Sequence, residues 1–122
     1  MATILIVDDE EPILSIVAEV VEEMGHKVLR ALNGREALQI VRASPPDVVL
    51  SDVMMPFLNG IELCRSIKAD PATRNIIVLL MSAVSADRGH AAGADGFVHK
   101  PFSLEDVETA IERGLARTGR DS

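Results

Sequence analysis

Five short apolar runs, separated by segments with helical periodicity, are the feature of the sequence that most constrains its fold. The runs show no alternation of apolar and polar residues, which is typical of strands covered on both faces of a parallel sheet. They cover residues 4–7, 28–29, 48–50, 76–81 and 97–98. Parallel strands require a helical crossover that packs back on the sheet. The alternation therefore predicts an α/β doubly wound fold.

The first three segments between the runs carry recognisable helix signals. In the first, apolar residues recur on one helical face, Pro12 marks the start and Gly25 the stop. The second begins after Asn33 and Gly34, and Asn59 is predicted to cap the third. These signals predict amphipathic helices lying on the sheet.

The last two segments differ in how clearly they are marked. Ser103 and, three residues later, Asp106 form the pattern of a capping box that opens the fifth helix. Only 84–92, rich in alanine and interrupted by Gly89, is available for a fourth helix, so a short or irregular one is expected. The whole pattern predicts five parallel strands with helices on both faces.

The length of 122 residues is that of a single domain. We expect this domain to occupy residues 1–118. The polar residues 119–122 are expected to form a tail.

Charge and composition exclude several classes of function. Twelve Lys and Arg against nineteen Asp and Glu give a net charge of -7, which repels both nucleic acid and anionic lipid. No apolar run approaches the roughly 20 residues that span a bilayer. The single Cys64 cannot form an internal disulfide and is expected to pack in the interior. We therefore expect a cytoplasmic protein without direct nucleic-acid binding or membrane insertion.

Polar residues follow four of the predicted strands, where open α/β sheets bind their ligands. They are Asp8, Asp9, Asp52, Ser82 and Lys100. Three neighbouring carboxylates repel one another unless a cation lies among them, and hard oxygen ligands without a His or Cys cluster favour Mg²⁺. A lysine and a hydroxyl nearby suit an anionic guest. The set predicts a site for a phosphoryl group.

Four segments of the chain carry a resemblance to a known family. They read IVDDEEPI, LSDVMMPFLNGIEL, LLMSA and GADGFVHKPF. In this order, and across nearly the whole chain, they resemble the receiver domain of two-component response regulators. The resemblance implies a flavodoxin-like (βα)5 fold.

The resemblance also implies roles for individual residues. Asp52 would be the phosphoacceptor, and Asp9, Asp52 and the backbone carbonyl of Met54 would bind Mg²⁺ directly. Asp8 would act on the metal through water. Lys100, before a proline that usually follows a cis peptide bond in this family, would pair with a phosphoryl oxygen.

The remaining implied roles concern switching. Ser82 would hydrogen-bond another phosphoryl oxygen, and Phe97 occupies the position of the family's switch aromatic. For Phe97 an ordinary core position is an equal alternative, and for Asp8 and Asp9 a solvated helix start is the alternative. The three histidines share no metal-ligand spacing, so solvated or hydrogen-bonded side chains are expected for them.

The expected function is therefore that of a phosphoacceptor in signalling. A histidine kinase or histidine phosphotransfer protein would donate the phosphoryl group, and an output protein would respond in trans. Only weak autocatalytic chemistry is expected, with no turnover of a metabolite. The alternatives are a receiver-like module that binds partners without phosphorylation and, with less support, an aspartyl-phosphate phosphatase. That class has a second Asp two residues after its nucleophile, a position that Met54 occupies here.

Overall fold

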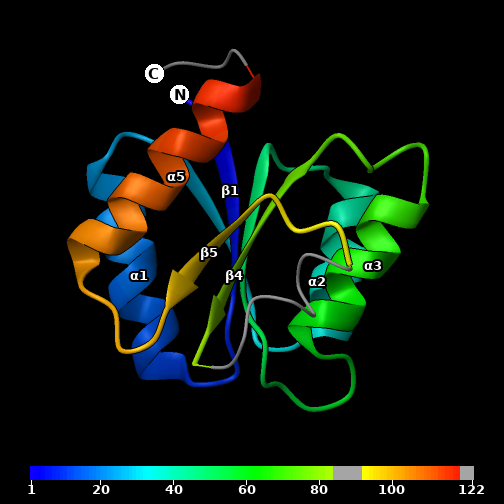
Figure 1. The fold of residues 1–122 in the computed structure, drawn as a ribbon, viewed down its shortest axis with the longest axis horizontal. Helices are drawn as coiled ribbons and strands as arrows, with labels where there is room; N and C mark the ends of the chain where they lie inside the picture. Colours follow the sequence, from blue (N-terminus) through cyan, green and yellow to red (C-terminus); the bar gives the residue numbers. More distant parts are fainter. Residues whose placement is uncertain (84–91, 119–122) are drawn as a thin grey trace.

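The computed structural model describes residues 1–83 and 92–118. The strands in these ranges form one five-stranded sheet. All strand pairs are parallel, and the strand order is β2-β1-β3-β4-β5. The strands are β1 Thr3–Val7, β2 Lys27–Ala31, β3 Val48–Asp52, β4 Ile77–Ser82 and β5 Gly96–His99. The predicted parallel α/β sheet is thus confirmed (Figure 1).

Helices cover both faces of the sheet. Figure 1 shows α1 (Glu11–Glu23) and α5 (Leu104–Thr118) on one face, with α2 (Gly34–Ala43) and α3 (Gly60–Ala69) on the other. Each face has its own apolar core, since alternate residues of the central strands point to opposite sides. The helix expected over 84–92 falls almost wholly on residues 84–91, which lie outside the described residues.

The helix ends follow the local signals of the sequence. Gly25 lies just past the end of α1 with φ 93°, a conformation that suits glycine. Asn59 and Glu62 form a capping box at the start of α3. The Asp106 amide likewise donates to Ser103 Oγ at 3.1 Å, and the Ser103 amide donates to Asp106 Oδ2 at 2.9 Å. These three predictions are confirmed.

The strands extend beyond the apolar runs that predicted them. The second run covers 28–29, but β2 spans Lys27–Ala31 because it pairs with β1 along its whole length, from Thr3 opposite Lys27 to Val7 opposite Ala31. Polar residues are tolerated there because β2 lies at an edge of the sheet. Cys64 is fully buried in α3, as predicted, and burial raises the pKa of its thiol to about 11.

The topology places the chemistry at one edge of the sheet. β1 pairs with β2 on one side and with β3 on the other, so the chain changes direction of winding at β1 and β3. Ligands of doubly wound folds bind at this switch point, beyond the carboxyl ends of the strands. None of the helices in the described ranges combines the length and apolar character that crossing a bilayer requires.

Candidate functional site

Asp52 is the last residue of β3 and lies at the centre of the candidate site. It is only 5% exposed. Its Oδ1 accepts a hydrogen bond from Lys100 Nζ at 2.7 Å, an ion pair that joins the end of β3 to the residue that follows β5. A buried carboxylate requires such a partner, because an unpaired charge in the interior is costly.

Two further carboxylates lie beside Asp52. Asp8 and Asp9 follow β1, the neighbour of β3 in the sheet. One carboxylate oxygen from each of Asp8, Asp9 and Asp52 lies within 4.8 Å of the other two. Asp8 is buried, whereas Asp9 is exposed to solvent. The structure therefore brings together the three acids that the strand-end argument selected.

Asp8 is the most perturbed of the three acids. Its side chain is 1% exposed, and its Oδ1 accepts a hydrogen bond from the Glu10 amide at 2.9 Å. Its Oδ2 is buried without a hydrogen-bond partner among the residues that the structure describes. Burial, followed by the charges of Asp52 and Asp9, raises the pKa of Asp8 to about 6 despite the hydrogen bond from Glu10 and the charge of Lys100.

These features fit a divalent cation with hard oxygen ligands. A buried carboxylate oxygen with no partner is rare, because leaving it unsatisfied costs free energy. Lys100 pairs with Asp52, and Asp8 Oδ2 lies in the acidic group without a partner in the described chain. Carboxylate oxygens are the ligands that Mg²⁺ prefers. The acidic group can therefore hold Mg²⁺.

Lys100 supplies the positive charge of the site. Burial alone lowers its pKa, but the hydrogen bond to Asp52 and the charges of Asp52, Asp8 and Glu10 outweigh burial, so the pKa of Lys100 is raised. The ammonium is thus charged at every pH near neutrality. Its peptide bond to Pro101 is cis.

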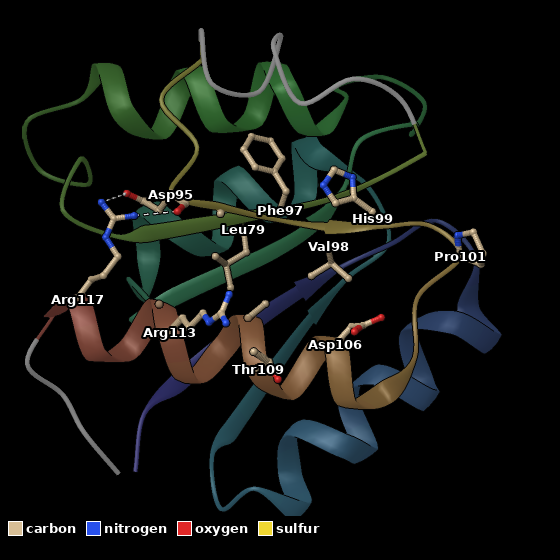
Figure 2. A pocket seen from close by; sticks show the side chains of 13 residues that line it. Leu79, Asp95, Phe97, Val98, His99, Pro101, Asp106, Thr109, Arg113 and Arg117 are labelled. Carbon is tan, nitrogen blue, oxygen red and sulfur yellow. Dashed lines mark hydrogen bonds and ion pairs between the residues drawn. The ribbon is translucent and has the colours of Figure 1, made fainter.

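Ser82 lies on β4, the neighbour of β3, and Phe97 lies on the edge strand β5, which pairs with β4. Ser82 is buried at the end of β4, and its carbonyl accepts a hydrogen bond from the Lys100 amide at 3.0 Å. Figure 2 shows Phe97 pointing to the α3 side of the sheet and Val98 to the α5 side. Phe97 accordingly packs, half-buried, against the core of the α2 and α3 face. Its role as a switch stays a prediction.

Met54 begins the loop that follows Asp52. Because methionine usually fills gaps in a core, the sequence predicts packing for the side chains of Met54, Met55 and Met81. Met81 is fully buried and Met55 is partly buried against the core, but Met54 is 73% exposed. The prediction is wrong for Met54 because the residue lies beyond the end of β3, where neither helix layer covers it.

Two glycines hold this loop in place. A Cβ on Gly60 would collide with the carbonyl oxygen of Asp52 and would lie 2.9 Å from Val53 Cα. A Cβ on Gly34 would likewise collide with the carbonyl oxygen of Leu58. The starts of α3 and α2 therefore approach the loop backbone so closely that only glycine fits.

Asp95 is a positioning residue that sequence reasoning did not single out. Its Oδ2 accepts from the Val78 amide at 2.8 Å and pairs with Lys68 Nζ at 2.8 Å. Arg117 pairs with Asp95 Oδ1 at 3.5 Å (Figure 2). Asp95 thus ties α3, β4 and α5 to the start of β5, the strand that leads to Phe97 and Lys100. In the sequence, Asp95 is only an acidic residue just before a predicted strand, and this pattern does not indicate its contacts.

A hollow of about 640 Å³ lies away from the acidic group. Figure 2 shows it between the edge strand β5 and the helix α5, with Leu79 and Val98 on its floor and Arg113 and Arg117 at its rim. It contains none of the three clustered acids. The candidate site is therefore defined by its chemistry and not by the size of a cavity.

Comparison of the whole structure with solved proteins defines its class. The signal receiver domain of a histidine kinase from Syntrophus aciditrophicus superposes with a TM-score of 0.92 at 32% identity, covering 100% of this chain and 96% of that one. The chemotaxis response regulator CheY4 of Vibrio cholerae superposes with a TM-score of 0.89 at 32% identity, covering 94% and 99%. The fold is that of a receiver domain.

Sequence comparison gives the family. The family model described as the response regulator receiver domain matches residues 4–112, and this chain belongs to that family. The phosphate regulon transcriptional regulatory protein PhoB of Pseudomonas aeruginosa is 37% identical over 121 residues, covering 96% of this chain and 53% of that protein. The alkaline phosphatase synthesis transcriptional regulatory protein PhoP of Bacillus subtilis is 35% identical, covering 94% and 49%. The chain thus spans about half the length of these curated relatives.

The raised pKa of Asp8 has a measurable effect on stability. Its folded-state pKa of about 6 lies above the unfolded value near 3.8, so ionised Asp8 destabilises the native state fully above about pH 6 and not at all below about pH 3.8. Without divalent cations, Asp8→Asn should therefore raise the free energy of unfolding at about pH 7.5 by about 1–3 kcal/mol. The gain should disappear as the pH falls to about 4. Urea denaturation at several pH values measures it.

The control for this prediction is Glu19→Gln, which neutralises an exposed carboxylate on α1. This variant should change the free energy of unfolding little at neutral pH. A loss of stability in Asp8→Asn at neutral pH would contradict the unfavourable burial of the charge.

Proposed function

We propose that this chain accepts a phosphoryl group on Asp52 and that the modification switches its binding to an output protein in trans. The donor is the phosphohistidine of a histidine kinase or of a histidine phosphotransfer protein. The observation that carries the proposal is the meeting of three carboxylates within 4.8 Å, with the Lys100 ammonium 2.7 Å from Asp52 Oδ1. Membership of the receiver family supports it.

The reaction exchanges one bond to phosphorus for another. A carboxylate oxygen of Asp52 forms a bond to phosphorus while the bond from phosphorus to the imidazole nitrogen breaks. The electron pair of the broken bond stays on the imidazole, which takes up a proton. Asp52 becomes an acyl phosphate. Because the chain itself is modified, it acts as a signalling protein with only weak autocatalytic activity.

Lys100 and Ser82 stabilise the new group. The Lys100 ammonium neutralises the Asp52 carboxylate in this structure and would pair with a phosphoryl oxygen after transfer. The Ser82 hydroxyl would donate a hydrogen bond to a second phosphoryl oxygen. The backbone hydrogen bond from Lys100 to Ser82 keeps the ends of β4 and β5 together for this purpose.

Asp8, Asp9, Asp52 and the backbone carbonyl of Met54 would hold Mg²⁺, with Asp8 acting through water. When bound, Mg²⁺ supplies positive charge that reduces the repulsion between the phosphoryl oxygens and the carboxylates. The unpaired Asp8 Oδ2 and the raised pKa of Asp8 support a cation at this place.

The signal would leave the site through Ser82 and Phe97. As the Ser82 hydroxyl moves toward the phosphoryl group, Phe97 would turn inward from its half-buried position on β5 and alter the surface that the output protein binds. The net charge of -7 supports output through protein contact, without direct binding of nucleic acid by this chain. We assign the receiver domain to residues 1–118 and a tail to 119–122, and place its action in the cytoplasm.

The test uses a small phosphodonor, so that no partner protein is needed. The chain is incubated with acetyl phosphate and Mg²⁺ and its intact mass is measured, with an EDTA-treated sample as the control. We expect one labile phosphoryl group per chain with Mg²⁺ and little or none with EDTA. Absence of the adduct at high donor concentration would favour a receiver-like module that binds partners without phosphorylation.

A further inference from the structure

Two large apolar side chains are exposed on the loop that joins β3 to α3. Met54 is 73% exposed and Phe57 is 74% exposed. Exposed apolar residues are ordinary when scattered singly, whereas these two belong to one short loop. We call the side chains of Met54 and Phe57 the apolar rim, because their loop starts directly after Asp52.

The backbone of Phe57 is in a conformation that costs free energy. Its φ is 69°, and among the described residues it is the one position other than glycine with a positive φ. Asparagine or glycine adopts this conformation more readily than an aromatic residue. Stability alone therefore disfavours phenylalanine here. Backbone outliers of this kind cluster at functional sites, where the side chain is retained for another reason.

The loop holds Phe57 outward in a fixed position. The Gly60 amide donates to the Val53 carbonyl at 2.9 Å and the Leu58 amide donates to the Pro56 carbonyl at 2.8 Å. The guanidinium carbon of Arg35 lies 5.4 Å from the centre of the Phe57 ring, a cation–π contact from the start of α2. Phe57 is thus held in place before any partner binds, which lowers the entropy cost of binding.

The apolar rim lies close to the candidate phosphoacceptor. Gly60, the first residue of α3, packs against the Asp52 carbonyl. Three peptide units separate Phe57 from Gly60, so their Cα atoms are at most about 11 Å apart. A protein interface of standard size covers about 800 Å² on each partner, a disc of roughly 16 Å radius. A protein centred on Asp52 would therefore cover Phe57.

We propose that the apolar rim is a docking contact for the protein that donates the phosphoryl group, with Phe57 as its main specificity-determining residue. This inference rests on the proposed function of Asp52. Because Asp52 is 5% exposed, a phosphohistidine can reach it only if the donor protein closes over the mouth of the site. An output partner has no such requirement. The donor should carry an apolar surface beside its phosphohistidine, since apolar groups at the centre of an interface contribute most to binding.

The test compares two substitutions at one position with two kinds of donor. Phe57→Asn removes the apolar ring and suits the positive φ, whereas Phe57→Leu keeps an apolar side chain. The protein donor is found by loading each histidine kinase and histidine phosphotransfer protein encoded in the same genome with radiolabelled phosphate. The one that transfers fastest to the wild-type chain is kept. Acetyl phosphate is the small donor, which makes no contact with the rim.

We expect Phe57→Asn to lower the rate constant of transfer from the protein donor by about tenfold or more, the effect of losing one strong interface contact. Phe57→Leu should retain most of that rate, and acetyl phosphate should load all three chains at similar rates. The melting temperature of Phe57→Asn should not fall below that of the wild type.

Three results would overturn the inference while leaving the proposed function standing. The first is equal transfer from the protein donor to Phe57→Asn and to the wild type. The second is an equal loss with both donors, which would mean a structural role for the ring. The third is a wild-type chain that acetyl phosphate loads but no protein donor does. Failure of acetyl phosphate to load the wild type would instead refute the proposed function itself.

Discussion

Asp52→Asn is expected to abolish phosphorylation by acetyl phosphate in the presence of Mg²⁺. An amide has nearly the shape of a carboxylate but lacks the anionic oxygen that attacks phosphorus. The side chain is buried at the end of β3, and an asparagine there can still accept the hydrogen bond from Lys100. The fold should therefore remain, and only the chemistry should be lost. Intact mass spectrometry and circular dichroism measure the two effects separately.

The matched control is Asp70→Asn, at the opposite end of α3 from the site. Asp70 Oδ1 accepts a hydrogen bond from the Ala72 amide, a local contact that an asparagine can also make. This variant should be phosphorylated like the wild type. If Asp52→Asn folds and is phosphorylated at the wild-type rate, Asp52 is not the phosphoacceptor.

Gly60→Ala is expected to cause the largest loss of stability among the substitutions considered. Its Cβ would collide with the carbonyl oxygen of Asp52 and lie 3.0 Å from the carbonyl carbon, and backbone atoms cannot rotate away as a side chain can. Crowding of this kind costs about 3 kcal/mol, and relaxation would displace the end of β3 that carries Asp52. Urea denaturation should show the loss, and loading by acetyl phosphate should fall with it.

Gly25→Ala separates crowding from backbone conformation. Gly25 has φ 93°, but a Cβ at this position would have no heavy atom within 4 Å. This variant should lose only about 1 kcal/mol, the cost of a positive φ, and should keep its phosphorylation. If Gly60→Ala is no less stable than Gly25→Ala, the close approach of α3 to β3 does not constrain the site.

Local hydrogen bonds explain which parts of the fold were predictable from the sequence. The cap at Asn59 and the capping box of Ser103 and Asp106 involve residues three apart, so their pattern is visible in the chain. The parallel sheet was predictable because buried strands must be apolar on both faces. The ends of β2 were not predictable, because its pairing with β1 fixes them, whereas its own composition does not.

The candidate site likewise combines features that the sequence predicts with contacts that it does not reveal. The rule that ligands bind beyond the ends of strands selected Asp8, Asp9 and Asp52, and the structure places them within 4.8 Å of one another. Their catalytic and metal-binding roles stay predictions. The direct pair of Lys100 with Asp52 was not predicted, since sequence reasoning assigned Lys100 to a phosphoryl oxygen. Contacts over 48 positions in the chain leave no local pattern.

Side-chain environments at the loop were the least predictable feature. The sequence favoured packing for Met54 because methionine usually fills core gaps, yet the side chain is 73% exposed. The role of Asp95 in joining α3, β4 and α5 also depends on contacts with Lys68 and Arg117, which are distant in sequence. Exposure and distant contacts follow from the packing of whole elements, which the order of residues alone does not reveal.

Locating the phosphoryl group in the wild-type chain tests the central claim most directly. After incubation with acetyl phosphate and Mg²⁺, reduction with borohydride converts an aspartyl phosphate to homoserine, and peptide mass spectrometry identifies the changed residue. We predict a single modified position, Asp52, and none when EDTA is present. Homoserine at position 8 or 9, or at no position, would contradict the account.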